Sequence, residues 1–194
     1  MPIQLVVENL NASIDDKVVL HDLAVTAQAG HILALMGKGG CGKSTFLRVI
    51  NRMAEEGGAV VSGHIMLDNS SIFMQDISLL RQKVGMVFTE PVLFAGNILG
   101  NITAGLRLQG IKKKQKLEEC AEETLGYMGI LEEFRDLLYT DASYLNRSQA
   151  QLVCIARALA LRPGLLLMDE PTRLLDSMTS MKVEDMMFNL KKDC

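Results

Sequence analysis

A glycine-rich loop, set between an apolar run and an amphipathic segment, constrains this chain more than any other feature. Residues Gly37–Ser44 match the pattern G-x-x-x-x-G-K-[ST] in full. The run Ile32–Met36 before it predicts a strand buried on both faces, and the apolar spacing within Ser44–Met53 predicts a helix. Strand, loop and helix in that order are the context that a phosphate-binding loop (Walker A motif) requires. The sequence therefore predicts a site for a nucleoside triphosphate, with ATP and Mg²⁺ expected.

Each residue type in this loop suits contact with phosphate. The glycines let backbone N–H groups turn inward around a phosphate, and the following helix adds the positive end of its dipole. We expect Lys43 to reach the β- and γ-phosphates, as a binding and a catalytic residue, and the Ser44 hydroxyl to ligate Mg²⁺. Cys41 is a small residue filling a loop position, with an oxidisable thiol as the alternative interpretation. The predicted nucleotide-binding residues are Gly37, Lys38, Gly39, Gly40, Cys41, Gly42, Lys43, Ser44 and Thr45.

Two carboxylates follow another apolar run near the end of the chain. Leu165–Met168 predicts a buried strand, and Asp169 and Glu170 come directly after it. Asp169 suits a metal-organising role, and Glu170 suits the polarisation of an attacking water, which makes it the second catalytic candidate. Four apolar residues before two acids are common by themselves. With the phosphate loop upstream, they predict the second half of a phosphoryl-transfer site.

The order of the remaining elements predicts the fold class. Ile3–Leu10 and Val18–Val25 are expected to form antiparallel strands joined by a turn at Asp15-Asp16, and Val84–Phe88 is expected to form another buried strand. The alternation of apolar strands and helices favours an α/β core. The sequence thus predicts a P-loop core with a mainly parallel sheet, N-terminal antiparallel strands and an inserted helical lobe.

The helical lobe divides the predicted core into two segments. Leu, Glu and Lys dominate from Asn97 to about Leu138, so we expect a single domain over 1–194, with the core at 1–90 and 155–194 and the lobe at 91–154. The Lys112-Lys113-Lys114 run within the lobe fits a solvated helix face, and a basic docking patch is the alternative.

Net charge, hydropathy and cysteine spacing argue against nucleic acid as a partner, a membrane-spanning segment and a cysteine metal site. Twenty basic and 23 acidic residues give a formal charge of −3, which offers no general attraction to nucleic acid. No apolar run approaches the roughly 20 residues that span a bilayer. Cys41, Cys120, Cys154 and Cys194 are scattered and form no metal-binding pattern, so we interpret them as reduced thiols of a cytoplasmic protein.

These motifs together resemble those of the ABC-type ATPases, and most closely the branch that imports inorganic phosphate. The resemblance rests on Val7–Asn11, Lys43–Arg48, Asn51–Met53, Val84–Phe88, Gly105–Leu108, Cys154–Leu159 and Asp169–Thr172. It implies an ATP-binding subunit that couples ATP binding and hydrolysis to transport. It also implies a second ATP-binding subunit, in a homo- or heterodimer, and membrane-embedded permease subunits contacted through the lobe. The chain would then be peripheral on the inner face of the cell membrane.

Several positions depart from the family pattern. The family signature Leu-Ser-Gly-Gly-Gln is replaced by Leu-Asn-Arg-Ser-Gln at Leu145–Gln149. The Arg147 side chain is expected to obstruct the partner's ATP, although a guanidinium can also bind phosphate. Thr89 occupies the glutamine-loop position, and Ile14 replaces the aromatic residue that stacks on adenine. Arg173-Leu174-Leu175-Asp176 replaces the family's Ser-Ala-Leu-Asp.

The sequence ends at Cys194, where we expect the chain to lack the family's final strand and switch histidine; His21, His31 and His64 all lie far upstream of Asp169-Glu170. Two functional hypotheses remain open. The chain is the ATPase subunit of a phosphate importer, or it is a nucleotide-binding module without efficient hydrolysis, as a regulatory partner or a degenerate copy.

Overall fold

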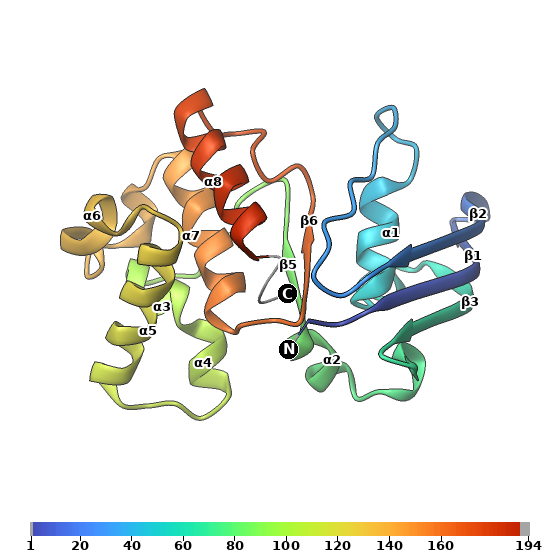
Figure 1. The fold of residues 1–194 in the computed structure, drawn as a ribbon, viewed down its shortest axis with the longest axis horizontal. Coiled ribbons are helices and arrows are strands. Elements are labelled where there is room, and N and C mark those ends of the chain that lie inside the picture. Colours follow the sequence, from blue (N-terminus) through green and yellow to red (C-terminus); the bar gives the residue numbers. More distant parts are fainter. Residues whose placement is uncertain (1, 191–194) are drawn as a thin grey trace. The chain divides into compact units, whose positions relative to one another are not determined.

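A tight turn joins the first two strands. In the computed structural model, which describes residues 2–190, β1 (Leu5–Ile14) and β2 (Lys17–Ala27) form an antiparallel hairpin (Figure 1). Asp15 and Asp16 have φ values of 47° and 60°. Two successive left-handed residues make a type I′ turn, whose twist matches that of the flanking strands. The predicted antiparallel opening is therefore confirmed.

The hairpin extends into a sheet of four strands. β3 (Val60–Leu67) pairs antiparallel with β1, and β4 (Ser70–Ser71) follows at the edge, which gives the order β2-β1-β3-β4. The register between β1 and β3 shifts between Glu8 and Asn11. At this irregularity Gly63 has a φ of 114°, and a Cβ there would lie 2.5 Å from the carbonyl oxygen of Asn9. Only glycine allows the two strands to approach so closely at this bulge.

Helix α1 (Lys43–Ile50) covers this sheet and completes its core (Figure 1). Its buried residues Phe46, Leu47, Val49 and Ile50 belong to the same apolar cluster as Leu5, Val7 and Leu10 of β1 and Ile65 and Leu67 of β3. Short elements connect the remaining parts. They are the 3₁₀ helices η1 (Glu55–Gly57) and η2 (Ile72–Met74), and helix α2 (Ile77–Lys83), which Asp76 caps.

Two strands that are far apart in the sequence form the second sheet. β5 (Val84–Val87) and β6 (Leu165–Met168) are hydrogen-bonded neighbours in it. Both strands were expected from their apolar runs. Antiparallel N-terminal strands, a parallel sheet and surrounding helices confirm the predicted fold class.

The strand predicted at Ile32–Met36 is wrong. The segment has no regular structure, and Ile32, Leu33 and Met36 are 42%, 47% and 93% exposed. A strand needs a neighbour for its backbone N–H and C=O groups. In the part of the chain that the structure describes, no strand pairs with this segment, and β5 and β6 pair with each other. Leu35 alone packs partly against the core.

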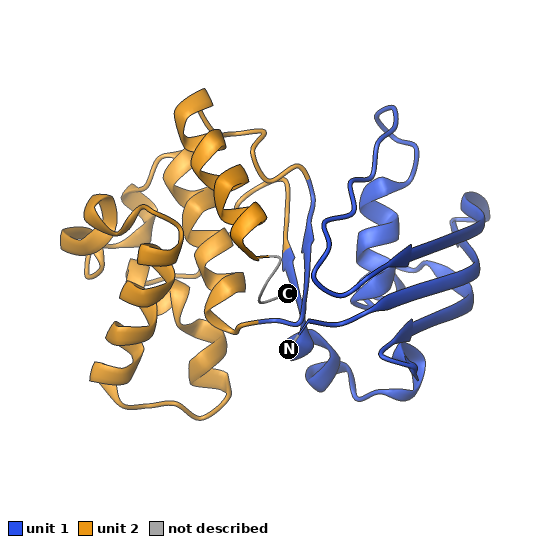
Figure 2. Cartoon of the chain, viewed as in Figure 1, with its two compact units in different colours: residues 1–86, 163–169, 191–194 blue, residues 87–162, 170–190 orange. Residues whose placement is uncertain are grey.

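The chain forms two compact units (Figure 2). The first contains the residues up to Met86 and Pro163–Asp169, and the second contains Val87–Arg162 and Glu170–Leu190. The predicted division into 1–90, 155–194 and 91–154 stays a prediction. Cys194 and the end of the predicted segment 155–194 lie outside the described residues.

The second unit is helical. Its elements are α3 (Ile98–Ile102), α4 (Ala104–Leu108), α5 (Lys114–Tyr127), α6 (Leu131–Phe134), η3 (Arg135–Leu137), η4 (Ala142–Tyr144), α7 (Arg147–Ala160) and α8 (Ser177–Leu190). Helices α3, α4 and α5 all contact α7. Buried Leu152, Ile155, Ala156 and Leu159 recur at helical spacing along α7 and form its apolar face. Between Pro2 and Leu190, no helix is long and apolar enough to cross a bilayer.

A buried polar network fastens the segment before α3 to α7. The Arg157 guanidinium donates to the Val92 carbonyl oxygen at 2.8 Å and to Asn101 Oδ1 at 2.7 Å, and it stacks 4.2 Å from the Phe94 ring centre. Asn101 is buried, accepts a bond from the Phe94 N–H and donates one to the Phe94 carbonyl oxygen. Removal of the Asn101 side chain therefore deprives the Arg157 guanidinium and the Phe94 backbone of a hydrogen-bond partner.

We expect Asn101→Ala to destabilise the chain by about 1–2 kcal/mol, because the partly buried Arg157 guanidinium and the Phe94 N–H lose their acceptor. The urea concentration at the unfolding midpoint measures this loss. Asn189→Ala, at an exposed position of α8, is the matched control and should change the free energy of unfolding by less than about 0.5 kcal/mol. Equal midpoints for the two variants would contradict a stabilising role for the network.

Candidate nucleotide-binding site

The predicted phosphate loop lies in the first unit, between β2 and α1. Gly40 and Gly42 have φ values of 77° and 97°, in the region that favours glycine. A Cβ on Gly42 would lie 2.8 Å from the Leu20 side chain and 3.0 Å from the Val19 carbonyl oxygen. The loop can therefore meet the start of α1 only because residue 42 has no side chain.

The Lys43 ammonium lies inside this loop. Its Nζ donates to the carbonyl oxygens of Gly37 at 2.8 Å and Lys38 at 3.1 Å. An ammonium has three donors, so these two bonds fix its position and leave one N–H for a ligand. The Cys41 sulfur lies 3.9 Å away and is at most a weak acceptor.

The start of α1 is open to an anion. Gly42 is the N-cap residue, no side chain caps the helix, and its first turn holds no acidic residue. The first N–H groups of a helix have no partner within the helix, and the dipole adds positive potential there. Gly39 and Gly40 leave open space where side chains would otherwise stand. The loop, the helix start and Lys43 thus form one concave set of donors that fits a phosphate chain.

Asp169 is a buried carboxylate at the end of β6, within the same unit. The residue is 5% exposed, and no described residue donates a hydrogen bond to its side chain. Its oxygens are not among the buried side-chain atoms that lack a partner, and carboxylate oxygens are ligands that Mg²⁺ prefers. The part of the chain that the structure describes contains no cluster of three His, Cys, Asp or Glu side chains for a metal. Asp169 therefore fits Mg²⁺ that arrives with a nucleotide.

Glu170, the next residue, belongs to the second unit. It is exposed, and its Oε2 lies 3.5 Å from Nη1 of Arg173, at the outer limit of a hydrogen bond. Its φ of 47° places it in the left-handed region, which is costly for a residue with a side chain. Such strained residues often occur at functional sites. The structure does not join Glu170 to the loop, so its catalytic role stays a prediction.

The stretch Leu145–Gln149 forms the start of α7. The Asn146 side chain accepts a bond from the Gln149 N–H at 2.9 Å, and Gln149 Oε1 accepts one from the Asn146 N–H at 3.3 Å. This capping box was readable from the Asn-x-x-Gln spacing, which our sequence analysis missed. Arg147 Nη2 forms an exposed ion pair with Glu90 Oε2 at 3.3 Å.

Comparisons with known proteins decide the family. The ABC transporter family model matches residues 20–173. A phosphate import ATP-binding protein, PstB, from Borreliella afzelii is 40% identical over 188 residues, which cover 95% of this chain and 72% of the relative. PstB 3 from Streptococcus pneumoniae is 40% identical over 190 residues, covering 96% and 76%. The chain belongs to the ABC transporter ATP-binding family.

Solved structures of ABC proteins agree with this assignment. An ATP-bound bacterial Atm1-family ABC exporter matches with a TM-score of 0.84 and 25% identity, over 99% of this chain and 33% of the exporter chain. CbiO1 from Clostridium perfringens, part of the ABC transporter complex cbiONQ, matches with a TM-score of 0.79 and 27% identity, over 97% and 73%. The chain is an ABC-type ATPase and binds ATP, and proteins of this kind dimerise and work with membrane permeases.

The cysteines of this ABC ATPase allow a direct test of the loop. Cys41 is exposed, whereas burial raises the pKa of the Cys154 thiol, against the opposing effect of Arg157. Alkylation requires the thiolate, so Cys41 should react with iodoacetamide faster than Cys154 near neutral pH.

Mg-ATP at about ten times its Kd should slow labelling of Cys41 about tenfold, because it occupies the loop, and should leave Cys154 unchanged. Peptide mass spectrometry over a time course measures both rates in one sample. Labelling of Cys41 at the same rate with and without Mg-ATP would contradict a nucleotide in this loop.

Proposed function

We propose that this chain is the ATP-binding subunit of an importer of inorganic phosphate and couples ATP binding and hydrolysis to transport. The observation that carries the proposal is an unaltered phosphate loop in a chain 40% identical, over 95% of its length, to PstB proteins. The comparisons do not favour the alternative of a nucleotide-binding module without efficient hydrolysis.

Four side chains and the backbone of the phosphate loop would act in the reaction. Lys43 and the N–H groups of residues 37–45 bind the phosphate oxygens, and the position of Lys43 Nζ among the loop carbonyls supports this role. The Ser44 hydroxyl and the Asp169 carboxylate hold Mg²⁺, which when bound neutralises charge on the phosphates. Glu170 orients the attacking water and accepts its proton.

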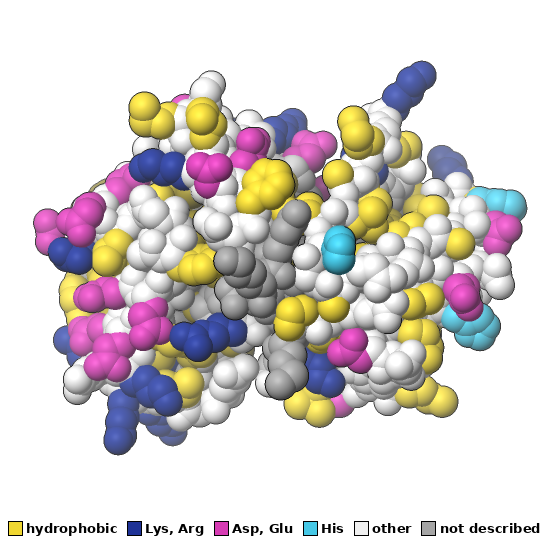
Figure 3. All heavy atoms as spheres, viewed as in Figure 1, with side chains coloured by type: hydrophobic (Ala, Val, Ile, Leu, Met, Phe, Trp, Pro, Cys, Tyr) yellow, Lys and Arg dark blue, Asp and Glu magenta, His cyan; other side chains and the backbone are white. Residues whose placement is uncertain are grey.

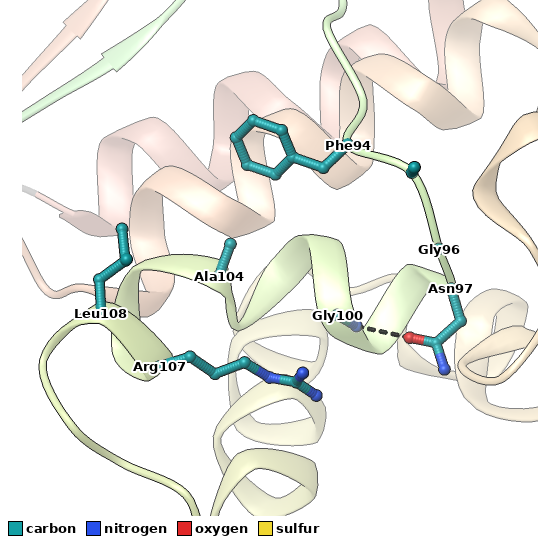
Figure 4. A pocket seen from close by; sticks show the side chains of 8 residues that line it. Phe94, Gly96, Asn97, Gly100, Ala104, Arg107 and Leu108 are labelled. Carbon is teal, nitrogen blue, oxygen red and sulfur yellow. Dashed lines mark hydrogen bonds between the residues drawn. The ribbon is translucent and has the colours of Figure 1, made fainter.

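The proposed partners are a second ATP-binding subunit and membrane-embedded permease subunits. A pocket of about 560 Å³ in the second unit is lined by Phe94, Ala95, Gly96, Asn97, Gly100, Ala104, Arg107 and Leu108 (Figure 4). We propose that this face of the helical lobe contacts the permease. The chain would then lie in the cytoplasm, on the inner face of the cell membrane, without contact to nucleic acid.

Substitutions at Lys43 and Glu170 separate binding from hydrolysis. Lys43→Ala should weaken Mg-ATP binding and abolish turnover, because the loop loses its charged donor. Glu170→Gln should bind Mg-ATP normally and lower turnover at least about 100-fold, because an amide accepts no proton from water. Equilibrium binding of a fluorescent ATP analogue and phosphate release measure the two steps. Glu133→Gln, at an exposed position of α6, is the matched control. Full turnover by Glu170→Gln would refute the assignment of the base.

Replacement of Arg147 tests the departure in the signature. Arg147→Gly should raise ATP turnover on the order of tenfold, because it removes a bulky side chain where the family has glycine and restores access of backbone donors. Glu90→Gln breaks the same exposed ion pair but keeps the guanidinium, and it should leave turnover unchanged. A fall in turnover for Arg147→Gly would instead assign phosphate binding to the guanidinium.

A further inference from the structure

One loop of the second unit concentrates positive charge on an acidic chain. Arg107, Lys112, Lys113, Lys114 and Lys116 lie within ten residues that include no carboxylate, although the whole chain carries −3. The segment Arg107–Lys116, here called the basic loop, joins the end of α4 to the start of α5. Figure 3 shows Lys and Arg side chains gathered over this part of the surface.

Most of these cations have no anionic partner among the residues that the structure describes. Lys114 pairs with Glu118 at 3.6 Å and lies 4.8 Å from the Tyr139 ring centre. Glu119, the next acid along α5, accepts a bond from the neutral Gln115 amide. Arg107, Lys112, Lys113 and Lys116 are exposed, and none of the described acids forms an ion pair with them. Their positive potential is therefore available to an external anion.

An uncovered apolar side chain lies in the same loop. Leu108, the last residue of α4, is 91% exposed, and Ile111 beside the lysines is partly exposed. In Figure 4 Leu108 stands at the rim of the pocket, at the end of its helix, and Arg107 extends away from it along another side of α4. An exposed leucine in the same loop as four lysines fits a surface that offers both anions and hydrocarbon.

We propose that the basic loop binds anionic lipid headgroups directly, with Leu108 entering the acyl boundary. Clusters of four to eight basic residues attract acidic lipids, and one buried apolar side chain adds a second, weaker anchor. This contact begins at Arg107 and Leu108, one end of the pocket proposed above for the permease, continues along the lysines, and needs no nucleotide. It gives the ATPase its own contact with the membrane surface.

The chemistry of the loop favours a membrane over an acidic protein segment. The cations are mainly lysines, which are hydrated point charges on flexible stems and match a diffuse layer of phosphates. Recognition of a defined carboxylate favours a fixed arginine fork, and Arg107 is the only arginine of the loop. Leu108 is also too exposed to act as the floor of a peptide groove.

Co-sedimentation of the full-length chain with vesicles tests the proposal. The probe is an equal mixture of phosphatidylglycerol and phosphatidylcholine, compared with phosphatidylcholine alone. The chain should bind the anionic vesicles at about 0.05 M salt and dissociate at about 0.5 M, because salt screens the attraction. Lys112→Ser/Lys113→Ser/Lys116→Ser should weaken binding about fivefold for each lysine, or roughly 100-fold in total. Leu108→Ser should weaken it about tenfold.

Lys17→Ser/Lys83→Ser/Lys182→Ser is the matched control, since it removes the same charge from exposed lysines elsewhere. It should bind vesicles as the native chain does, apart from a small effect of net charge. Equal losses in the two triple variants, or equal binding to neutral vesicles, would overturn the proposal. Binding to poly-glutamate but not to vesicles would assign the loop to an acidic protein segment instead. Mg-ATP affinity, measured on the same samples, reports separately on the proposed function.

Discussion

Among the described residues, no side chain caps the N–H groups at the start of α1, which leaves them available to an anion. Gly42 brings the loop against Val19 and Leu20 of β2, so the position of the helix start is fixed by the sheet. Lys43 adds a full positive charge beside the free N–H groups. In the same unit, Asp169 is a carboxylate at the end of β6 that is 5% exposed. In the proposed function, a triphosphate would bind at the start of α1 and its Mg²⁺ at Asp169.

Helix α7, in contrast to α1, has side chains that cap its N-terminal N–H groups. Its Asn146 side chain accepts a bond from the Gln149 N–H, and the cation Arg147 lies in the first turn, where the helix dipole is positive. Glu90 offsets that unfavourable charge through an exposed ion pair, which solvent weakens. The two helix starts therefore differ in how well they can bind an anion. No side chain caps the start of α1, whereas a capping box and the Arg147 side chain lie at the start of α7.

The second unit also carries a pocket and a charged loop, which share Arg107 and Leu108. The Arg157 and Asn101 network fixes the segment at Val92 and Phe94 against α7, with buried bonds that tolerate little change. The basic loop lies beyond α4, and its lysines make few bonds within the protein. The pocket beside Phe94 is suited to a protein partner. The flexible lysine side chains of the basic loop are suited to anionic lipid headgroups. Both contacts would place an ATPase against a membrane without any helix of its own entering it.

The sequence by itself determined the features that depend only on residues adjacent in the chain. The phosphate loop and the Asp15-Asp16 turn were predictable because glycine φ angles and turn geometry are local. The structure alone decided what Ile32–Met36 would do, because an apolar run becomes a strand only if another strand offers hydrogen bonds. It alone joined Asn101 to Arg157, 56 residues away, and left Leu108 uncovered. Such pairings depend on the packing of distant segments, which no local pattern specifies.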